Sequence, residues 1–589
     1  MADVLASLVG RHIDLVAAPF TLPRSRVLVL RSEDGAGVRV HTSEYEKRLS
    51  DCRVLDAVVV TDADGAALPV ADVLPHRIAF SDVLRSSSEH AEVSRSLSEH
   101  REAERDETLS PGQGGSSRFA RSTTEASASL TFDGPSALSI AGVEGARVLL
   151  RHPDGRVEEH ALTPTGIRLR VGADRSVAVE PGDHPAALDA TEALWDDWLG
   201  RCPRVRDDLQ QMAAFCWWVL GANIVELPSL GGARAVVPSK IGYVGLWQWD
   251  AYFIAVGLRH GDPALAREQL QLAFRFARED GQLPDVVHEE GVLATSDDLP
   301  ESDRATLRRA GSQIADPDAP VPLTKPPLAA WALRKVLDAE DAPDWARAQL
   351  DRVIRSQDWW FSGSDLDGDG MPEYGHPYSS GLDDSPIFDG PIPTTAPDLG
   401  AYLVRQDREI AALLRRYRPD ADSAPFLARA ERTERLLLGL WDAGDGRFVA
   451  RGAGEEIRSD TIVGLMPLLT GSLPAGIRDA LREAVDDPAR FALTWGLPTV
   501  AASDPDFSPE RMWRGPVWIN TNVLVAEGLE ASGFPERARE LREQTVGLVV
   551  HGGGPHEYFN PHTGRKAERA TTAFGWSAAL FLDLAVALS

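Results

Sequence analysis

The stretch Leu-Gln-Gln-Met-Ala-Ala-Phe-Cys-Trp-Trp-Val-Leu, residues 209–220, predicts a strongly apolar helix and opens the helical part of the chain. Short and long loops alternate after it, as in antiparallel helix pairs. No sequence period recurs, which argues against the alternative of a helical solenoid. Twelve helices in residues 191–589 therefore predict an (α/α)6 toroid. The helices that follow residues 209–220 are expected at 249–260, 263–279, 325–340, 345–361, 398–417, 425–441, 460–469, 474–485, 519–532, 535–550 and 571–588.

Before residue 190 the chain alternates apolar and polar residues in the manner of strands. A segment at about 86–125 is rich in Ser, Glu, Arg and His, and predicts a long polar arm. We therefore predict a multidomain protein, with an antiparallel β-sandwich over residues 1–190 followed by an (α/α)6-barrel catalytic domain over 191–589. No catalytic constellation is visible in the β region. The clearest strand-like stretches are 26–30, 38–40, 58–60, 126–130, 146–150 and 167–171.

Composition narrows the functional class. A length of 589 residues predicts two or three domains, and 43% hydrophobic with 25% charged residues is typical of soluble globular proteins. A net charge of −28 repels nucleic acids and anionic membranes, so we expect neither as a partner. Three cysteines without metal-ligand spacing, no signal peptide at Met1–Val4 and no apolar stretch of about 20 residues predict a cytoplasmic protein. The oligomeric state stays open.

Two acidic, aromatic-rich loops carry the candidate catalytic residues. Asp383 and Asp384 lie in Ser-Ser-Gly-Leu-Asp-Asp-Ser-Pro, residues 379–386, where Gly381 and Pro386 bracket a rigid turn. Glu557 lies far downstream in Pro-His-Glu-Tyr-Phe-Asn-Pro, residues 555–561. Glycosidic bond hydrolysis needs two carboxyl groups, one to protonate the leaving oxygen and one to activate water. An Asp in a turn is usually structural, so this hypothesis depends on the surrounding residues.

The surroundings supply candidates for substrate binding, since flat aromatic faces pack on sugar rings and all fifteen tryptophans follow residue 190. Asp250 offers several acceptor sites for sugar hydroxyls, or it caps a helix. Arg514 either holds a substrate oxygen or pairs with a loop acid, and Lys325 reaches the cleft or lies solvated on its rim. The candidate substrate-binding residues are Tyr243, Trp247, Trp249, Asp250, Lys325, His376, Tyr378, Asp384, Trp513, Arg514, Trp518, Asn520 and Trp576.

One stretch indicates a possible structural cation. Asp-Leu-Asp-Gly-Asp-Gly-Met-Pro-Glu, residues 365–373, alternates oxygen ligands with glycines that permit a tight turn. Its start is typical of a calcium loop, but the remaining EF-hand spacing is missing. The candidate Ca²⁺ ligands are Asp365, Asp367, Asp369 and Glu373, and the alternative is a polar turn without an ion. No cofactor is required by the chemistry expected.

Together these stretches resemble glycoside hydrolase family 63 and its clan of α/α-toroid glycosidases, which includes processing α-glucosidases and the hydrolases of mannosylglycerate and glucosylglycerate. The resemblance implies an inverting mechanism with Asp383 as general acid and Glu557 as general base. Asp384 stands where the family often has Asn, and Lys325 replaces an expected Gln. The matching segments, in the family's order, are 247–253, 325–331, 365–373, 379–386, 513–520, 557–564 and 574–577.

The resulting hypothesis is an inverting exo-acting α-glycosidase for small α-glucosides or α-mannosides, such as glucosylglycerate, mannosylglycerate or short gluco-oligosaccharides. Burial among aromatic residues is expected to raise the pKa of Asp383, while Glu557 stays ionised. The alternatives are a trehalase-like or α-glucan debranching hydrolase, and a catalytically inactive carbohydrate-binding protein. The sequence leaves open which sugar is bound and which aglycone follows it.

Overall fold

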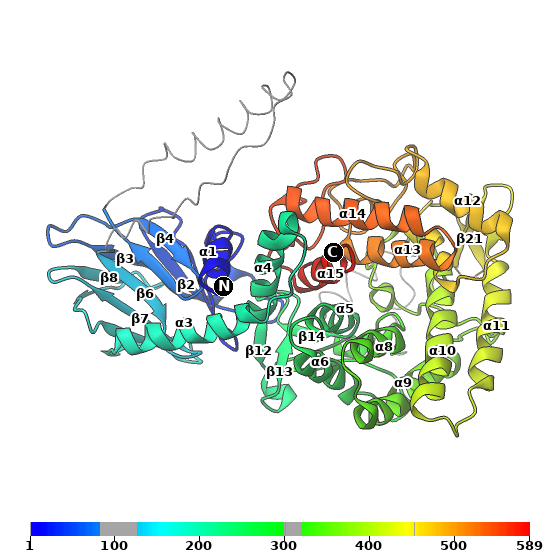
Figure 1. Ribbon diagram of the computed structural model, residues 1–589, viewed down its shortest axis with the longest axis horizontal. Helices are drawn as coiled ribbons and strands as arrows, with labels where there is room; N and C mark the ends of the chain where they lie inside the picture. Colours follow the sequence, from blue (N-terminus) through cyan, green and yellow to red (C-terminus); the bar gives the residue numbers. More distant parts are fainter. Residues whose placement is uncertain (1, 83–125, 300, 302–319, 453) are drawn as a thin grey trace, which may run out of the picture.

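The computed structural model describes residues 2–82, 126–299, 301, 320–452 and 454–589. An N-terminal part built from antiparallel sheets precedes a helical part (Figure 1), which confirms the predicted fold class. The predicted polar arm at about 86–125 lies outside the described residues.

The N-terminal part is a sandwich of two antiparallel sheets, visible on one side of the molecule in Figure 1. One sheet has the strand order β1-β2-β3-β8-β9 and the other β11-β10-β7-β6-β5-β4. Alternate residues of both sheets, such as Val58, Val60, Phe132 and Ile140, are buried in one core. The strands are β1 (Val27–Arg31), β2 (Val38–Thr42), β3 (Arg53–Thr61), β4 (Val70–Leu74), β5 (Arg77–Phe80), β6 (Ala128–Phe132), β7 (Ala137–Gly142), β8 (Arg147–Arg151), β9 (Val157–Ala161), β10 (Ile167–Val171) and β11 (Val177–Pro181).

Each helical stretch expected after residue 200 overlaps a helix of the structure. The stretch 460–469 is a 3-10 helix rather than an α-helix, and it contains Pro467, a residue disfavoured inside α-helices. The helices are α1 (Ala2–Gly10), α3 (His184–Gly200), α4 (Asp207–Ala222), α5 (Gln248–Leu258), α6 (Pro263–Arg275), α8 (Ala329–Ala339), α9 (Pro343–Gly363), α10 (Pro397–Tyr417), α11 (Ala424–Leu438), η7 (Ile462–Thr470), α12 (Ala475–Asp486), α13 (Ile519–Ala531), α14 (Pro535–Gly552) and α15 (Gly575–Ala587).

The helices close into a ring. Helix contacts run from α5 to α8, α10, η7, α13 and α15, and from α15 back to α5. Around this inner ring pack α4, α6, α9, α11, α12 and α14 (Figure 1). All residues of α5 and nearly all of α13 and α15 are buried, as inner helices of a toroid require. The closed ring excludes the solenoid alternative for the described helices.

Helix α3 was not predicted from the sequence, and it links the sandwich to the toroid. Asp183 caps it by accepting a hydrogen bond from a main-chain N–H of the first turn. Thr191 donates to the carbonyl of Phe132 in the sandwich at 2.9 Å. At the other end Trp198 stacks on Trp217 of α4 with ring centroids 4.6 Å apart, and each indole N–H donates to the other's main-chain carbonyl. These contacts fix the two parts against each other.

Short strands and 3-10 turns connect the helices of the toroid, and one 3-10 turn, η1, lies in the sandwich between β2 and β3. Among the described residues, no helix is both long and apolar enough to cross a bilayer. The short elements are β12 (Ile224–Glu226), β13 (Arg234–Val236), β14 (Gly245–Trp247), β15 (Val286–His288), β16 (Gly291–Leu293), β17 (Thr394–Thr395), β18 (Trp441–Asp442), β19 (Arg447–Phe448), β20 (Ala450–Gly452), β21 (Glu455–Ile457), η1 (Leu49–Cys52), η2 (Pro228–Leu230), η3 (Ser296–Asp298), η5 (Pro377–Ser380) and η6 (Pro386–Phe388).

Candidate active site

A cavity of about 520 Å³ lies where loops lead into the inner helices α5, α8, α13 and α15. Most of the predicted site residues line it, although they come from segments far apart in the sequence. Polar and aromatic side chains share its wall, as in sites that bind sugars. The predicted residues on its wall are Asp383, Glu557, Tyr243, Trp247, Trp249, Asp250, Lys325, Tyr378, Trp513, Trp518 and Trp576.

The conformation of the loop that carries Asp383 depends on a glycine in its turn. Gly381 ends η5 with φ of 70°, and a Cβ there would lie 2.2 Å from Cζ2 of Trp249, so only glycine fits. Oδ1 of Asp383 is buried and lies 3.9 Å from Nζ of Lys325, while 30% of the side chain is exposed. Burial, partly offset by the Lys325 ammonium, raises the pKa of Asp383. This carboxyl is suited to donate a proton.

Glu557 occupies a different environment on another loop. Its Oε1 accepts a hydrogen bond from Oη of Tyr243 at 3.0 Å, and its Oε2 accepts one from the main-chain N–H of Thr571 at 2.8 Å. Burial raises the pKa of Glu557 to about 7, and the two hydrogen bonds limit the shift because they stabilise the charged form. Glu557 is therefore about half ionised at pH 7 and increasingly ionised above it, and the ionised form is the one that can act as a general base.

Lys325 pairs with the carboxylate of Asp285, a residue that was not predicted from the sequence. Its Nζ lies 3.0 Å from Oδ1 of Asp285 and donates to the carbonyl of Tyr378 at 2.7 Å, with only 5% of the lysine side chain exposed. Burial opposes the charge on Lys325, but the carboxylates of Asp285 and Asp383 outweigh it and raise the lysine pKa. Burial raises the pKa of Asp285 to about 7. Asp285 lines the cavity, but in the sequence it is only an acid directly before the apolar pair Val286-Val287, which does not mark it as a site residue.

Asp250 lines the cavity from the first turn of α5. The residue at the N-cap of that helix is Trp247, and no side chain caps it there, so the capping alternative for Asp250 does not hold. Burial raises the pKa of Asp250 to about 8, against the lowering effect of Lys325. A buried carboxyl group in a sugar-sized cavity can exchange hydrogen bonds with substrate hydroxyls.

Aromatic rings form one continuous wall around these carboxyl groups. Trp513 stacks on Trp518 with centroids 3.6 Å apart and planes 7° from parallel. Trp576 meets Trp249 edge to face at 5.4 Å, and Trp518 also stacks against Tyr558. Interlocked rings have few alternative rotamers, so this wall is rigid and offers flat faces to a sugar.

Asp384 and Arg514 do not line the cavity, contrary to the prediction. Oδ1 of Asp384 accepts from the main-chain N–H of Trp513 at 2.9 Å, and its Oδ2 accepts from Nε of Arg511 at 3.1 Å. Arg514 forms a two-point ion pair with Asp389, which was its alternative interpretation. These side chains fasten the loop of Asp383 to the loop of Trp513, and so they position the site rather than contact the cavity.

His376 and Asn520, also predicted to bind substrate, are buried and do not line the cavity. Nδ1 of His376 accepts a hydrogen bond from the main-chain N–H of Tyr378 at 3.0 Å, and its ring lies edge-on to that tyrosine. Burial lowers the pKa of His376 to about 3, so its imidazole is neutral. Asn520 is fully buried in the first turn of α13. His376 therefore supports the wall residue Tyr378, whereas the buried side-chain amide of Asn520 has no hydrogen-bond partner among the described residues.

Several wall residues carry no signal in the sequence. Three of them belong to the loop between β2 and η1 of the sandwich, a region in which the sequence shows no catalytic constellation. They approach the cavity only because the two parts of the chain pack together. The wall residues that were not predicted are Tyr45, Glu46, Lys47, Asp285, His288, Glu290, Leu293, Asp298, Leu299, Gly381, Met512 and Phe574.

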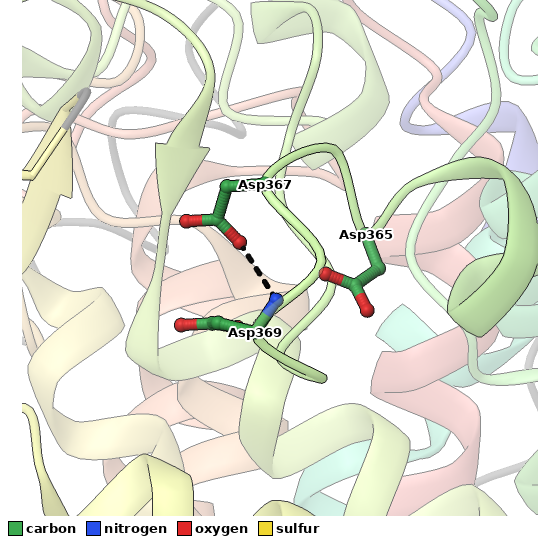
Figure 2. Close-up of side chains that lie close together, drawn as sticks. All are labelled: Asp365, Asp367 and Asp369. Atoms are coloured by element: carbon green, nitrogen blue, oxygen red, sulfur yellow. Dashed lines mark hydrogen bonds between the residues drawn. The ribbon is translucent and has the colours of Figure 1, made fainter.

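The predicted calcium loop forms a compact acidic turn (Figure 2). One carboxylate oxygen of each of Asp365, Asp367 and Asp369 lies within 4.8 Å of the others, and Oδ1 of Asp367 accepts from the N–H of Asp369. Glu373 does not join them, because its Oε2 accepts from the N–H of Leu366 and its Oε1 from Thr395. Three clustered carboxylates suit Ca²⁺. The cation therefore stays a prediction, with three ligands instead of four.

Comparison with known proteins places the helical part among glycoside hydrolases. The family model described as "Mannosylglycerate hydrolase MGH1-like glycoside hydrolase domain" matches residues 243–577. A mannosylglycerate hydrolase from Thermus thermophilus is 29% identical over 410 residues, covering 59% of this chain and 95% of that protein. A glucosylglycerate hydrolase from Mycolicibacterium hassiacum is 26% identical over 452 residues, covering 63% of this chain and 97% of that protein.

The folds agree as well. The crystal structure of a family 63 mannosylglycerate hydrolase from Thermus thermophilus, in complex with Tris and D-glycerate, superimposes with a TM-score of 0.52 and 26% sequence identity. The alignment covers 62% of this chain and 98% of that structure. The family-model match begins at Tyr243, so the β-sandwich lies outside it.

Proposed function

Because the chain belongs to the mannosylglycerate hydrolase MGH1-like glycoside hydrolases, within family 63, we propose that it hydrolyses small α-glucosides or α-mannosides with inversion at the anomeric carbon. The observation that carries the proposal is the pair of Asp383 and Glu557 on the wall of one cavity. Their environments differ, since one carboxyl group faces an ammonium and the other accepts two hydrogen bonds.

The reaction we propose is one displacement. Asp383, protonated at the start, gives its proton to the glycosidic oxygen while the bond from that oxygen to the anomeric carbon breaks. Glu557, ionised at the start, takes a proton from a water molecule whose oxygen attacks the same carbon from the opposite face. The products are the free sugar with inverted anomeric configuration and the released alcohol. Proton exchange with solvent then restores both carboxyl groups.

The remaining wall residues bind and orient the sugar in this proposal. The rings of Trp249, Trp513 and Trp518 exclude water and pack on C–H faces, and Asp250 binds hydroxyl groups. The Lys325–Asp285 pair fixes the electrostatic surroundings of Asp383. Such a preorganised site stabilises the charge that develops in the transition state.

The relatives support a small substrate. They are named for glycosides of glycerate, and the chain covers nearly their whole length. A cytoplasmic location is part of the proposal. It is supported by three cysteines that remain free thiols in the structure, Cys52, Cys202 and Cys216, as expected in a reducing compartment.

The test is hydrolysis of a panel of pure α-glycosides by the full chain, with the released sugar identified. The panel contains glucosylglycerate, mannosylglycerate, glucosylglycerol, mannosylglycerol, trehalose, kojibiose, nigerose and maltose. Release of glucose or mannose from at least one member, absent with Asp383→Asn, is the expected result. Hydrolysis that persists in Asp383→Asn would contradict the role of that residue, and no release from any member would contradict the substrate class.

A further inference from the structure

The β-sandwich contributes a wall to the active-site cavity. Tyr45, Glu46 and Lys47 line the cavity, although they belong to the loop after β2. The family-model match begins at Tyr243, so this loop is an addition to the part of the chain that matches the family.

The loop is fixed against the toroid by main-chain and ionic contacts. Oγ of Ser43 donates to the carbonyl of Lys240, and the N–H of Glu46 donates to the carbonyl of Gly242 at 2.8 Å. Arg26 of the sandwich forms an ion pair with Glu289 of the toroid beside these bonds. Gly242 directly precedes Tyr243, the donor to Glu557. The backbone segment that anchors this loop therefore also carries the side chain that contacts Glu557.

Tyr45 presents a supported aromatic ring at this wall. Its ring stacks on His288 with centroids 4.0 Å apart and planes 8° from parallel, and it lies 5.5 Å from the ring of Trp247. Burial lowers the pKa of His288, so the imidazole beneath the ring is uncharged at neutral pH. A ring backed in this way is a ready platform for the C–H face of a second ring or polyol.

The loop lies at the mouth of the cavity. Glu46 and Lys47 are exposed, whereas the tryptophans beside the catalytic carboxyls are almost fully buried. An exo-acting enzyme takes the terminal sugar into the deep end, so the leaving group points to the mouth. Tyr45, Glu46 and their neighbours are thus placed to contact the aglycone.

The charges at the mouth select against an anion. Glu46, Glu290 and Asp298 line this end. Among the described wall residues the ammonium groups belong to Lys47 and Lys325, and each pairs with a carboxylate, Glu44 at 2.7 Å and Asp285 at 3.0 Å. A carboxylate on the aglycone would meet like charges, whereas hydroxyl groups would find acceptors.

From these observations we propose that the β-sandwich loop Tyr45–Lys47, with His288, Glu290 and Asp298, forms an aglycone subsite for a neutral, hydroxylated aglycone such as a sugar ring or a polyol. The inference rests on the proposed hydrolysis of small α-glycosides and narrows its substrates. The neutral aglycone proposed here differs from glycerate, the aglycone in the glycosides after which the relatives are named.

The first test compares two substrates that differ in one group. Glucosylglycerate and 2-O-α-glucosylglycerol carry a carboxylate or a hydroxymethyl group at the same aglycone position, and the mannosyl pair is measured in parallel. The expected result is a kcat/KM at least about tenfold higher for the glycerol compound, since one like-charge contact of about 1.4 kcal/mol gives a factor of ten. Equal values, or a preference for the carboxylate, would overturn the neutral aglycone.

The second test asks whether the loop acts on the aglycone. We compare Tyr45→Ala with Tyr45→Phe, which keeps the ring, and with Arg48→Ala, an exposed neighbour outside the cavity wall. The kcat/KM of Tyr45→Ala is expected to fall about 10–100-fold more on the preferred glycoside than on the corresponding α-glycosyl fluoride, whose leaving group needs no subsite. Equal losses on both substrates, or a loss with Arg48→Ala as large as with Tyr45→Ala, would refute the subsite.

The fluoride separates the two proposals. If the wild-type protein hydrolyses α-glucosyl or α-mannosyl fluoride, and Tyr45→Ala hydrolyses the preferred glycoside as fast as the wild type does, only the aglycone subsite is contradicted. If the wild-type protein hydrolyses neither fluoride and no glycoside, the proposed function fails and the subsite with it.

Discussion

Removing the hydroxyl group of Tyr243 should move the acidic limb of the pH profile. Tyr243→Phe deletes the donor that lies 3.0 Å from Oε1 of Glu557 and leaves the ring in place. A hydrogen bond to a charged group contributes about 1.5–3 kcal/mol, which corresponds to about 1–2 pKa units at 1.36 kcal/mol per unit. The pKa of Glu557, about 7 in the native site, should therefore rise to about 8–9.

The sign follows from the role of Glu557. A general base is active when ionised, so activity is lost as the pH falls through its pKa, and a higher pKa moves that loss to higher pH. The kcat/KM of Tyr243→Phe at pH 6 should be about 10–100-fold below wild type, from the 1–2 unit shift, and should recover towards wild type near pH 9.

The measurement is kcat/KM from pH 5 to pH 10 on the best substrate of the panel. Tyr417→Phe is the matched control, because Tyr417 also donates to a carboxylate, Asp341 at 2.7 Å, but away from the cavity. The control should keep the wild-type acidic limb. If the limb of Tyr243→Phe stays at the wild-type pH, then either Glu557 is not the base or Tyr243 does not set its pKa.

Three further experiments have definite expected results. Asp383→Asn and Glu557→Gln should each lower kcat by about 10²–10⁴-fold. Thermal melting at pH 8 should show no loss of stability in either variant. The reason is that both acids have a raised pKa in the folded protein, so their charged forms lower the stability of the wild type as the pH rises through that pKa. Lys325→Met leaves buried carboxylates unpaired and should cost about 3–5 kcal/mol of unfolding free energy. Denaturant titration should show that the double variant Lys325→Met/Asp285→Asn regains part of the unfolding free energy lost in Lys325→Met. If the double variant regains none of it, the pairing of Lys325 with Asp285 is contradicted. Adding Ca²⁺ after chelation should raise the melting temperature of the wild type but not of Asp365→Asn, and an equal response would rule out the acidic turn as the site.

The toroid could be predicted from the sequence because its helices carry their own signals. Apolar periodicity and proline or acidic residues at helix starts are local properties, and they survive in the isolated sequence. The exception at 460–469 also carries a local signal, since Pro467 is disfavoured inside an α-helix and this stretch forms a 3-10 helix. Helix α3 was missed because its buried residues meet two different partners and so obscure a single stripe. Thr191 contacts the sandwich, whereas Trp195 and Trp198 stack on tryptophans of α4.

The active site could be predicted only where a residue stands in a distinctive local setting. Asp383 and Glu557 are flanked by turn and aromatic residues that mark them as loop acids aimed at a cleft. Asp285 and Tyr45 stand in ordinary strand and loop sequence, and tertiary packing alone brings them to the cavity. Conversely, Asp384 and Arg514 lie in the same distinctive stretches, but their ion pairs turn them away from the cavity.

The most direct test of the proposed mechanism is the anomeric configuration of the first product. Proton NMR of wild-type protein with its best α-glycoside, recorded within minutes of mixing, distinguishes the two anomers before mutarotation equalises them. One displacement by water, with Asp383 as acid and Glu557 as base, predicts that the β-anomer forms first. If the α-anomer forms first, the reaction proceeds with retention, and Asp383 and Glu557 do not act as the acid and base of a single displacement.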